Sequence, residues 1–127
     1  MPQNEKLYIT YRRKMLGLLD TFSSEQEQQQ YKQAVPFVHI PFELFDQWGE
    51  IYKTEYKWFY KVYTPEAIVQ LQKINKLINS IIHQYKEELE DVPEILDNPL
   101  WQQLMSETQK VKEAIEKQYT TTYNQSI

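Results

Sequence analysis

The 127-residue chain has 41% hydrophobic and 25% charged side chains, the composition of an ordinary globular domain rather than of a disordered one. Cysteine is absent, which excludes disulfides, thiolate metal sites and a cysteine nucleophile, and two glycines are too few for the usual phosphate-binding loop or nucleophile elbow. The net charge of −4 disfavours long-range attraction to a nucleic acid or to an anionic membrane.

The sequence also lacks the segments that direct a protein to a membrane. No apolar run approaches the roughly 20 residues that cross a bilayer, and the first residues show no signal-peptide pattern. We therefore expect a cytoplasmic protein that does not contact a membrane. The scarcity of glycine, which tight hairpins need, favours helices over sheets.

The first predicted helix starts near Asn4, a suitable N-cap, and has apolar residues three and four positions apart. They are Leu7, Tyr8, Tyr11, Met15, Leu18, Leu19 and Phe22. Residues 7–11 are also rich in strand formers, so a short strand there is the alternative. Ser24 and Glu27 have the spacing of a capping box and predict a short helix over residues 25–30, which has almost nothing to bury and is expected to be exposed.

Residues 35–41 form an apolar connector bounded by prolines, which remove backbone donors and favour extended geometry. We expect this connector to lay Phe37, with Val38 or Ile40, across the end of the bundle. Pro41 is expected in the first turn of the next helix, where its missing N–H has no cost.

The third predicted helix spans residues 42–63 and carries 9 of the 18 aromatic residues of the chain. Its apolar side chains cover about 200° of the helix surface, whereas a surface helix needs little more than 100°. This face is therefore either enclosed by neighbouring helices or partly free for a partner. Tyrosine and tryptophan dominate the hot spots of protein interfaces. The candidate partner-binding residues are Tyr52, Tyr56, Trp58, Tyr60 and Tyr63.

Glu55 lies between the two apolar stripes of this third helix. If it is buried there, its carboxylate needs a cation such as Arg12, Arg13 or a bound ligand. A pocket that contains Glu55 and His39 as its polar groups is the candidate small-molecule or enzymatic site. The plainer alternative is a structural ion pair.

Thr64, Pro65 and Glu66 give the clearest helix start in the chain, with an N-cap, a proline at the first position and an acid in the first turn. The helix that follows runs to about Leu89. Because one broad half of it is apolar, we expect it to pack centrally between two neighbours. The last helix, over residues 99–119, has a narrower apolar stripe and is expected to need one neighbour.

These elements predict an all-α fold, an antiparallel helical bundle of about four main helices with a short second helix and an apolar, proline-bounded connector. We expect one helical domain over residues 1–119 and a flexible C-terminal tail over residues 120–127.

No set of residues argues for catalysis. His39 and His83 are the only histidines, so neither a metal site nor a cofactor is expected. The only material for contact with nucleic acid is the run at residues 12–14, Arg-Arg-Lys, and the row Lys53, Lys57 and Lys61. The lysines of the row are expected to pair with Asp46 and Glu50 on the same helix.

We therefore expect a small non-enzymatic protein-binding domain, such as an adaptor, an inhibitor or an immunity-type protein, that docks through its aromatic helix face. Acidic residues at the rim would speed association with a basic target. One alternative is a small-molecule-binding bundle or a modest enzyme with a pocket around Glu55. The other is a self-associating structural protein that forms a homodimer. Nucleic acid is the least favoured partner.

Overall fold

The computed structural model describes the backbone of residues 2–126 and the side chains of residues 5–119, and within that part the chain forms helices and no strand. The expected all-α class is therefore confirmed, and the strand alternative for residues 7–11 is wrong. In chain order the elements are α1 (Pro2–Ser23), α2 (Glu25–Ala34), α3 (Ile40–Ile51), α4 (Phe59–Val62), α5 (Pro65–Tyr85), the 3-10 turns η1 (Lys86–Glu88) and η2 (Glu94–Asp97), and α6 (Pro99–Ser126).

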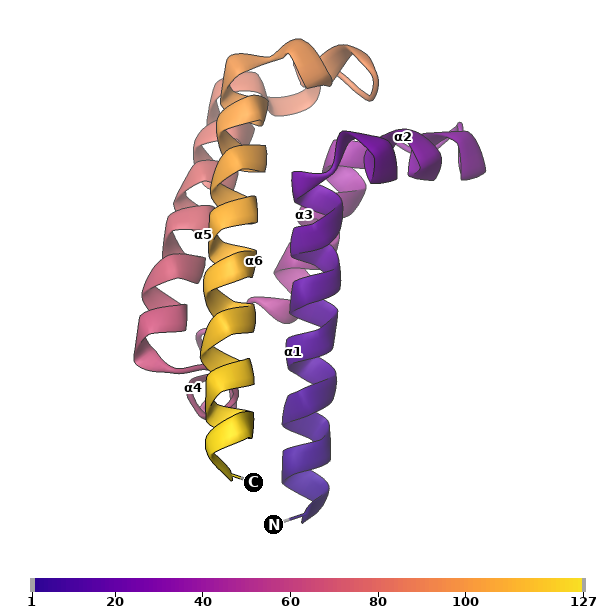
Figure 1. Ribbon diagram of the computed structural model, residues 1–127. Coiled ribbons are helices and arrows are strands. Elements are labelled where there is room, and N and C mark those ends of the chain that lie inside the picture. Colours follow the sequence, from indigo (N-terminus) through magenta and orange to yellow (C-terminus); the bar gives the residue numbers. More distant parts are fainter. Residues whose placement is uncertain (1, 127) are drawn as a thin grey trace.

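Helices α1, α3, α5 and α6 alternate in direction, and α2 crosses the end of α1 (Figure 1). Helix α6 packs against both α1 and α5, while α3 packs on α1. Helix α5 also has two neighbours, as expected, because it packs on α6 and its Asn75 accepts a hydrogen bond from the Nε1 of Trp48 in α3 at 2.9 Å. The expectation that the last helix needs only one neighbour is wrong, since α6 packs against two helices. Ile82, at one edge of the apolar half of α5, is exposed, and so is Val69 on the opposite face of the helix.

Side-chain caps fix the helix starts, as the sequence predicts. The Oγ of Ser24 accepts a hydrogen bond from the backbone N–H of Glu27 at 3.1 Å, and the Oγ1 of Thr64 accepts one from Ala67 at 3.1 Å. Asn98 caps α6 in the same way. Each cap satisfies a backbone donor that the helix itself cannot pair.

The short helix α2 is fastened to the core by a polar side chain. Gln28 is fully buried and donates from its Nε2 to the carbonyls of Thr21 and Phe22, while its Oε1 accepts from the Nε1 of Trp101. Beside it, the rings of Phe22, Phe45 and Trp101 pack with centroids 5.9 to 6.3 Å apart. The expectation that this helix has almost nothing to bury is wrong at Gln28.

The connector between α2 and α3 turns Phe37 outward, where it is 89% exposed, and buries Ile40 instead. Two contacts set this geometry. The Nζ of Lys32 donates to the carbonyl of Val38 at 2.9 Å, and Asp91 accepts a hydrogen bond from the backbone N–H of Ile40 at 3.0 Å. The expectation that Phe37 covers the end of the bundle is wrong, because this backbone pairing directs its side chain to solvent.

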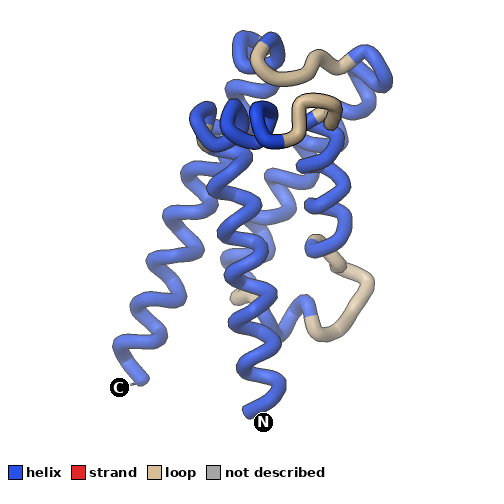
Figure 2. Tube along the Cα trace, turned by 90° about the vertical axis from the view of Figure 1, so that its right-hand side faces the viewer, coloured by secondary structure: helices blue, strands red, loops and turns tan. Residues whose placement is uncertain are grey.

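The predicted continuous helix over residues 42–63 is also wrong. Helix α3 ends at Ile51, and the chain makes a series of turns before the single helical turn α4 (Figure 2). Tyrosine, threonine and tryptophan are poor helix formers, and they fill this segment just after Gly49. After the break the chain returns to the core, where Phe59 and Val62 are buried.

Helix α5 ends at Tyr85, and Lys86 adopts a left-handed backbone conformation at φ 52° that turns the chain into η1. The backbone of α6 continues to Ser126. The predicted flexible tail, residues 120–127, lies outside the residues whose side chains are described.

Candidate functional site

We call residues 52–63 the aromatic turn. Its backbone is held by short-range hydrogen bonds, with the N–H of Tyr52 donating to Trp48, that of Tyr56 to Lys53 and that of Phe59 to Tyr56, at 2.8 to 3.2 Å. These bonds close successive tight turns rather than a helix, so neighbouring side chains point in different directions. The turn thereby separates its aromatic residues into an inner and an outer group.

The inner group continues the core. Tyr52 stacks on Trp48 with ring centroids 5.0 Å apart and meets Phe59 edge-on at 5.4 Å. Phe59 in turn packs against Tyr63 at 4.9 Å. Tyr63 is only 3% exposed. The prediction that Tyr63 contacts a partner is wrong, because the turn directs its ring into the bundle.

The outer group is a stack of parallel rings. Trp58 stacks on Tyr11 of α1 with centroids 4.4 Å apart, and the ring of Tyr56 lies nearly parallel to Trp58 at 6.2 Å. Tyr56 is 51% exposed and Tyr60 is 53% exposed, while Trp58 and Tyr52 are half-buried. Of the five candidate residues, Tyr56 and Tyr60 therefore present most surface to solvent.

Hydrogen bonds to neighbouring helices fix the turn in place. The Oη of Tyr60 donates to the carbonyl of Thr54 at 2.8 Å and bridges the turn. The carbonyl of Val62 accepts from the Nη1 of Arg12 at 3.0 Å and from the Oη of Tyr119 at 2.9 Å. These bonds join the turn to both α1 and α6, so its exposed rings sit on a rigid backbone.

Burial shifts the acidity of three tyrosines in or near the turn. It raises the pKa of Tyr63 far above its usual value, with a smaller upward effect from Tyr119. Burial also raises the pKa of Tyr119 and, with a contribution from Tyr60, that of Tyr52. All three phenols stay protonated near neutral pH, so none of them supplies a base.

Glu55 and His39 do not form a pocket. Glu55 is exposed on the turn, because the helix that would have placed it between two apolar stripes ends at Ile51. His39 lies just before the first residue of α3, whereas Glu55 lies beyond its last residue. Because a helix rises about 1.5 Å per residue, the length of α3 separates His39 from Glu55. The expected shared pocket is therefore not present among the described residues.

His39 instead has a structural role at the start of α3. Its Nδ1 accepts a hydrogen bond from the backbone N–H of Phe42 at 3.3 Å, so the Nε2 carries the proton and donates to the carbonyl of Leu89 at 2.8 Å. The ring also stacks on Phe42 at 4.2 Å. The histidine thus caps one helix and ties it to the loop after η1.

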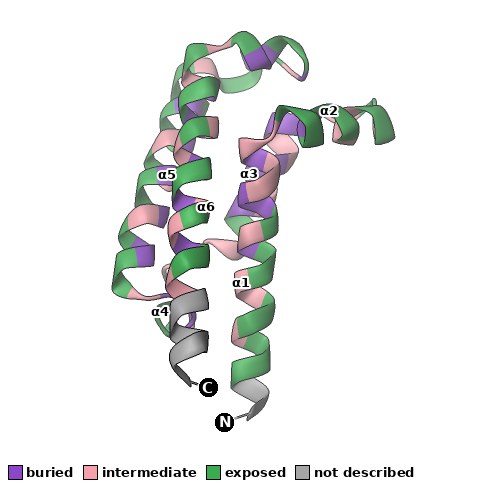
Figure 3. Cartoon of the chain, viewed as in Figure 1, coloured by how far each residue is buried: buried purple, intermediate pink, exposed green. Residues whose placement is uncertain are grey.

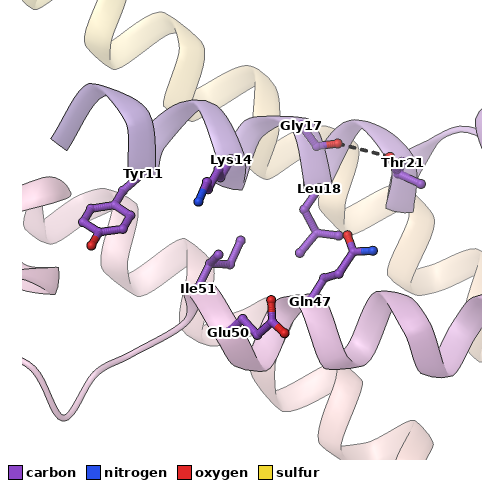
Figure 4. A pocket seen from close by; sticks show the side chains of 8 residues that line it. All are labelled: Tyr11, Lys14, Gly17, Leu18, Thr21, Gln47, Glu50 and Ile51. Carbon is purple, nitrogen blue, oxygen red and sulfur yellow. Dashed lines mark hydrogen bonds between the residues drawn. The ribbon is translucent and has the colours of Figure 1, made fainter. Parts of the chain in front are cut away.

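A groove of about 500 Å³ lies between α1 and α3, next to the outer ring stack (Figure 4). Its walls are Tyr11, Lys14, Gly17, Leu18 and Thr21 from α1, and Gln47, Glu50 and Ile51 from α3. Tyr11 belongs to both the groove and the stack, so the two features are continuous. The pattern of the sequence did not indicate this groove, because it depends on where α3 ends.

No group of three or more metal-ligating side chains occurs among residues 5–119, and none of the helices described there is long and apolar enough to span a bilayer. Neither a protein-family model, nor a curated protein, nor a solved structure matches the chain. The functional argument therefore depends on the geometry of the aromatic turn and the groove beside it.

Proposed function

We propose that this chain is a non-enzymatic protein-binding domain that docks through the outer rings of the aromatic turn, Tyr56, Trp58 and Tyr60. The observation that carries the proposal is the exposure of Tyr56 and Tyr60 on a backbone that is hydrogen-bonded to two other helices. Exposed tyrosines supply large contact area with a polar tip and few rotatable bonds.

A rigid turn matters for the energetics of docking. Ordering a mobile side chain on binding costs about 0.5–1.5 kcal/mol, and a surface that is already ordered avoids much of that cost. Here Trp58 stacks with both Tyr11 and Tyr56, and the phenol of Tyr60 donates a hydrogen bond to the carbonyl of Thr54. The exposed rings are therefore arranged before a partner arrives.

Affinity capture from the native cell extract tests this proposal, with the partner then purified and its dissociation constant measured. The double variant Tyr56→Ser, Tyr60→Ser is expected to weaken binding by at least about tenfold, since two interface aromatics are removed. Phe37→Ser is the matched control, because Phe37 is a more exposed aromatic at the opposite end of α3. Equal binding by the double variant and the wild type overturns the proposal.

Self-association through the same rings is the second arrangement that this exposure supports. A homodimer with two-fold symmetry would bring the Tyr56 and Tyr60 surfaces of two copies together. Sedimentation at several concentrations distinguishes the two cases. A dimer that disappears in the double variant but not in Phe37→Ser identifies a second copy as the partner.

A further inference from the structure

The aromatic turn lies in a basic part of an acidic protein. Residues 5–14 and 52–63 together hold seven basic and two acidic side chains, a net charge of +5. The rest of the chain holds seven basic and sixteen acidic side chains, a net charge of −9. The two basic segments lie together in space, because α1 packs against α4 and Arg12 donates to the carbonyl of Val62.

The densest run of acidic side chains lies at the opposite end of the bundle. Residues 86–97 hold six acidic side chains and one lysine, and they lie beside α2, far from α4 (Figure 1). Much of the surface there and along α1 is exposed (Figure 3). The molecule therefore has a basic aromatic end and an acidic end, and a partner meets very different charges at each.

The three lysines of the turn are free to meet a partner. No carboxylate within residues 5–119 lies at ion-pair distance from Lys53, Lys57 or Lys61. The expected pairs with Asp46 and Glu50 do not form, because the helix that would have aligned them ends at Ile51. These lysines surround the exposed rings Tyr56 and Tyr60 in the sequence, so aromatic and cationic groups share one surface.

We propose that the partner presents an acidic protein segment, whose carboxylates meet Lys53, Lys57 and Lys61 while its apolar side chains pack on Tyr56 and Tyr60. This inference depends on the proposed function and specifies the chemistry of the partner. It reverses the expectation of a basic target, since the densest acidic run of this chain, residues 86–97, lies away from the rings. Complementary charge speeds association and rejects partners of the wrong sign.

A protein segment fits this surface better than a nucleic acid does. A nucleic-acid site needs a basic track along which successive phosphates can run. Here the remainder of the chain, outside the two basic segments, has a net charge of −9. This charge repels an extended phosphate backbone. A short acidic peptide, in contrast, needs no more than the three free lysines and the two rings.

Titration of the full chain with defined probes tests the proposal. The probes are a short peptide in which Glu and Asp alternate with Leu and Phe, the same peptide with Lys in place of the acids, and an oligothymidylate. We expect the acidic peptide alone to bind, with amide NMR shifts that cluster at residues 53–61. Its affinity should fall as ionic strength rises from about 20 to about 200 mM, because exposed charges are screened.

Charge variants give the decisive comparison. Changing Lys53, Lys57 and Lys61 together to Gln is expected to weaken binding of the acidic peptide roughly tenfold, because each exposed ion pair contributes up to about 1 kcal/mol. The control lysines Lys73, Lys76 and Lys110 are all exposed, and their change to Gln removes the same charge elsewhere. This control triple variant should bind as the wild type does.

Each other result overturns the inference. Absence of binding by the acidic peptide does so, as does equal weakening by both triple variants, which would indicate a response to net charge alone. Tighter binding of oligothymidylate at residues 53–61 would replace the protein partner by a nucleic acid. If Tyr56→Ser, Tyr60→Ser abolishes capture of the native partner but the lysine triple variant does not, the protein-binding proposal stands and only the acidic character of the partner fails.

Discussion

The amide oxygen of Gln28 accepts a hydrogen bond from the indole nitrogen of Trp101 at 3.0 Å, and both side chains are fully buried. The amide nitrogen of Gln28 donates to the carbonyls of Thr21 and Phe22 in the last turn of α1. One side chain thus satisfies three buried polar groups on two helices, which explains how the polar helix α2 is attached to the bundle.

Replacement of Gln28 by Leu is expected to lower the free energy of unfolding by about 2–4 kcal/mol, because the indole N–H and two carbonyls lose their partner. Urea unfolding measures this loss. Gln30→Leu is the control, since Gln30 lies on the same helix but is exposed and should change stability by no more than about 0.5 kcal/mol. Equal losses in the two variants would contradict the assigned role of the amide.

Local signals in the sequence were enough to predict the fold class and most helix starts. A helix cap involves only residues within one turn, as with Ser24 and Glu27 or with Thr64 and Pro65. The start of such a helix can therefore be predicted from the local sequence. The apolar periodicity of α1 and α6 likewise indicates a buried stripe, and Leu19 and Ile115 are fully buried, although Leu7 at the start of the predicted stripe is exposed.

The candidate site was predicted less well, because it depends on contacts between distant residues. Trp58 faces Tyr11 only when the chain leaves the helix after Ile51, and nothing in the local pattern indicates that partner. The same break exposes Glu55 and buries Tyr63. Periodicity gave the right residues for an aromatic surface, but the wrong geometry for presenting them.

Asp91 links the α2–α3 connector to the loop after η1. It should make the free energy of unfolding fall at low pH. Its carboxylate accepts hydrogen bonds from Lys32 at 2.6 Å, from the N–H of Ile40 at 3.0 Å and from the N–H of Val92 at 2.7 Å. Burial is the largest single influence and raises the pKa of Asp91, but these bonds together hold it below its ordinary value. The carboxylate therefore stabilises the fold above the unfolded pKa of about 3.9, and this contribution is lost as the pH falls through the lower folded value.

Replacement of Asp91 by Asn is expected to cost about 1–3 kcal/mol at about pH 7, because the ion pair and a charge-assisted bond are lost. The difference in the free energy of unfolding between wild type and variant should narrow as the pH falls toward about 2.5, because the wild-type carboxyl takes up a proton as the pH falls through its lowered pKa. Urea unfolding at both pH values measures the gap. Asp97→Asn serves as the control, since Asp97 is exposed. A gap of the same size at both pH values would rule out the proposed linkage.

Lys86 occupies a backbone conformation, φ 52° and ψ −127°, that suits glycine better than lysine. Its side chain is exposed, so its removal loses no packing. We expect Lys86→Gly to raise the free energy of unfolding by about 1 kcal/mol. Lys73→Gly makes the same chemical change in the interior of α5 and should instead lower it by about 1 kcal/mol. Changes of the same sign in both variants would show that Lys86 is not strained.

Tyr119 joins α6 to the end of the aromatic turn and should make the fold sensitive to alkali. Its Oη donates to the carbonyl of Val62 and accepts from the N–H of Thr64 at 3.1 Å, with the guanidinium of Arg12 4.5 Å from the ring centre. Burial raises the pKa of Tyr119, although the hydrogen bonds and Arg12 lower it in part. A raised folded pKa means that the stability is fully present below the unfolded value of about 10 and is lost as the pH rises through the folded value.

We therefore expect Tyr119→Phe to lower the free energy of unfolding by about 1–2 kcal/mol at about pH 8, because two hydrogen bonds disappear. The variant should also lose less stability than the wild type between about pH 8 and about pH 10.5, since it lacks one phenol that must ionise on unfolding. Urea unfolding at the two pH values gives both quantities. Tyr56→Phe, at an exposed ring, should match the wild type at each pH. If Tyr119→Phe loses as much stability at high pH as the wild type does, the phenol of Tyr119 is not the group that makes stability depend on alkaline pH. Tyr63, whose pKa burial raises further, is then the residue to replace next.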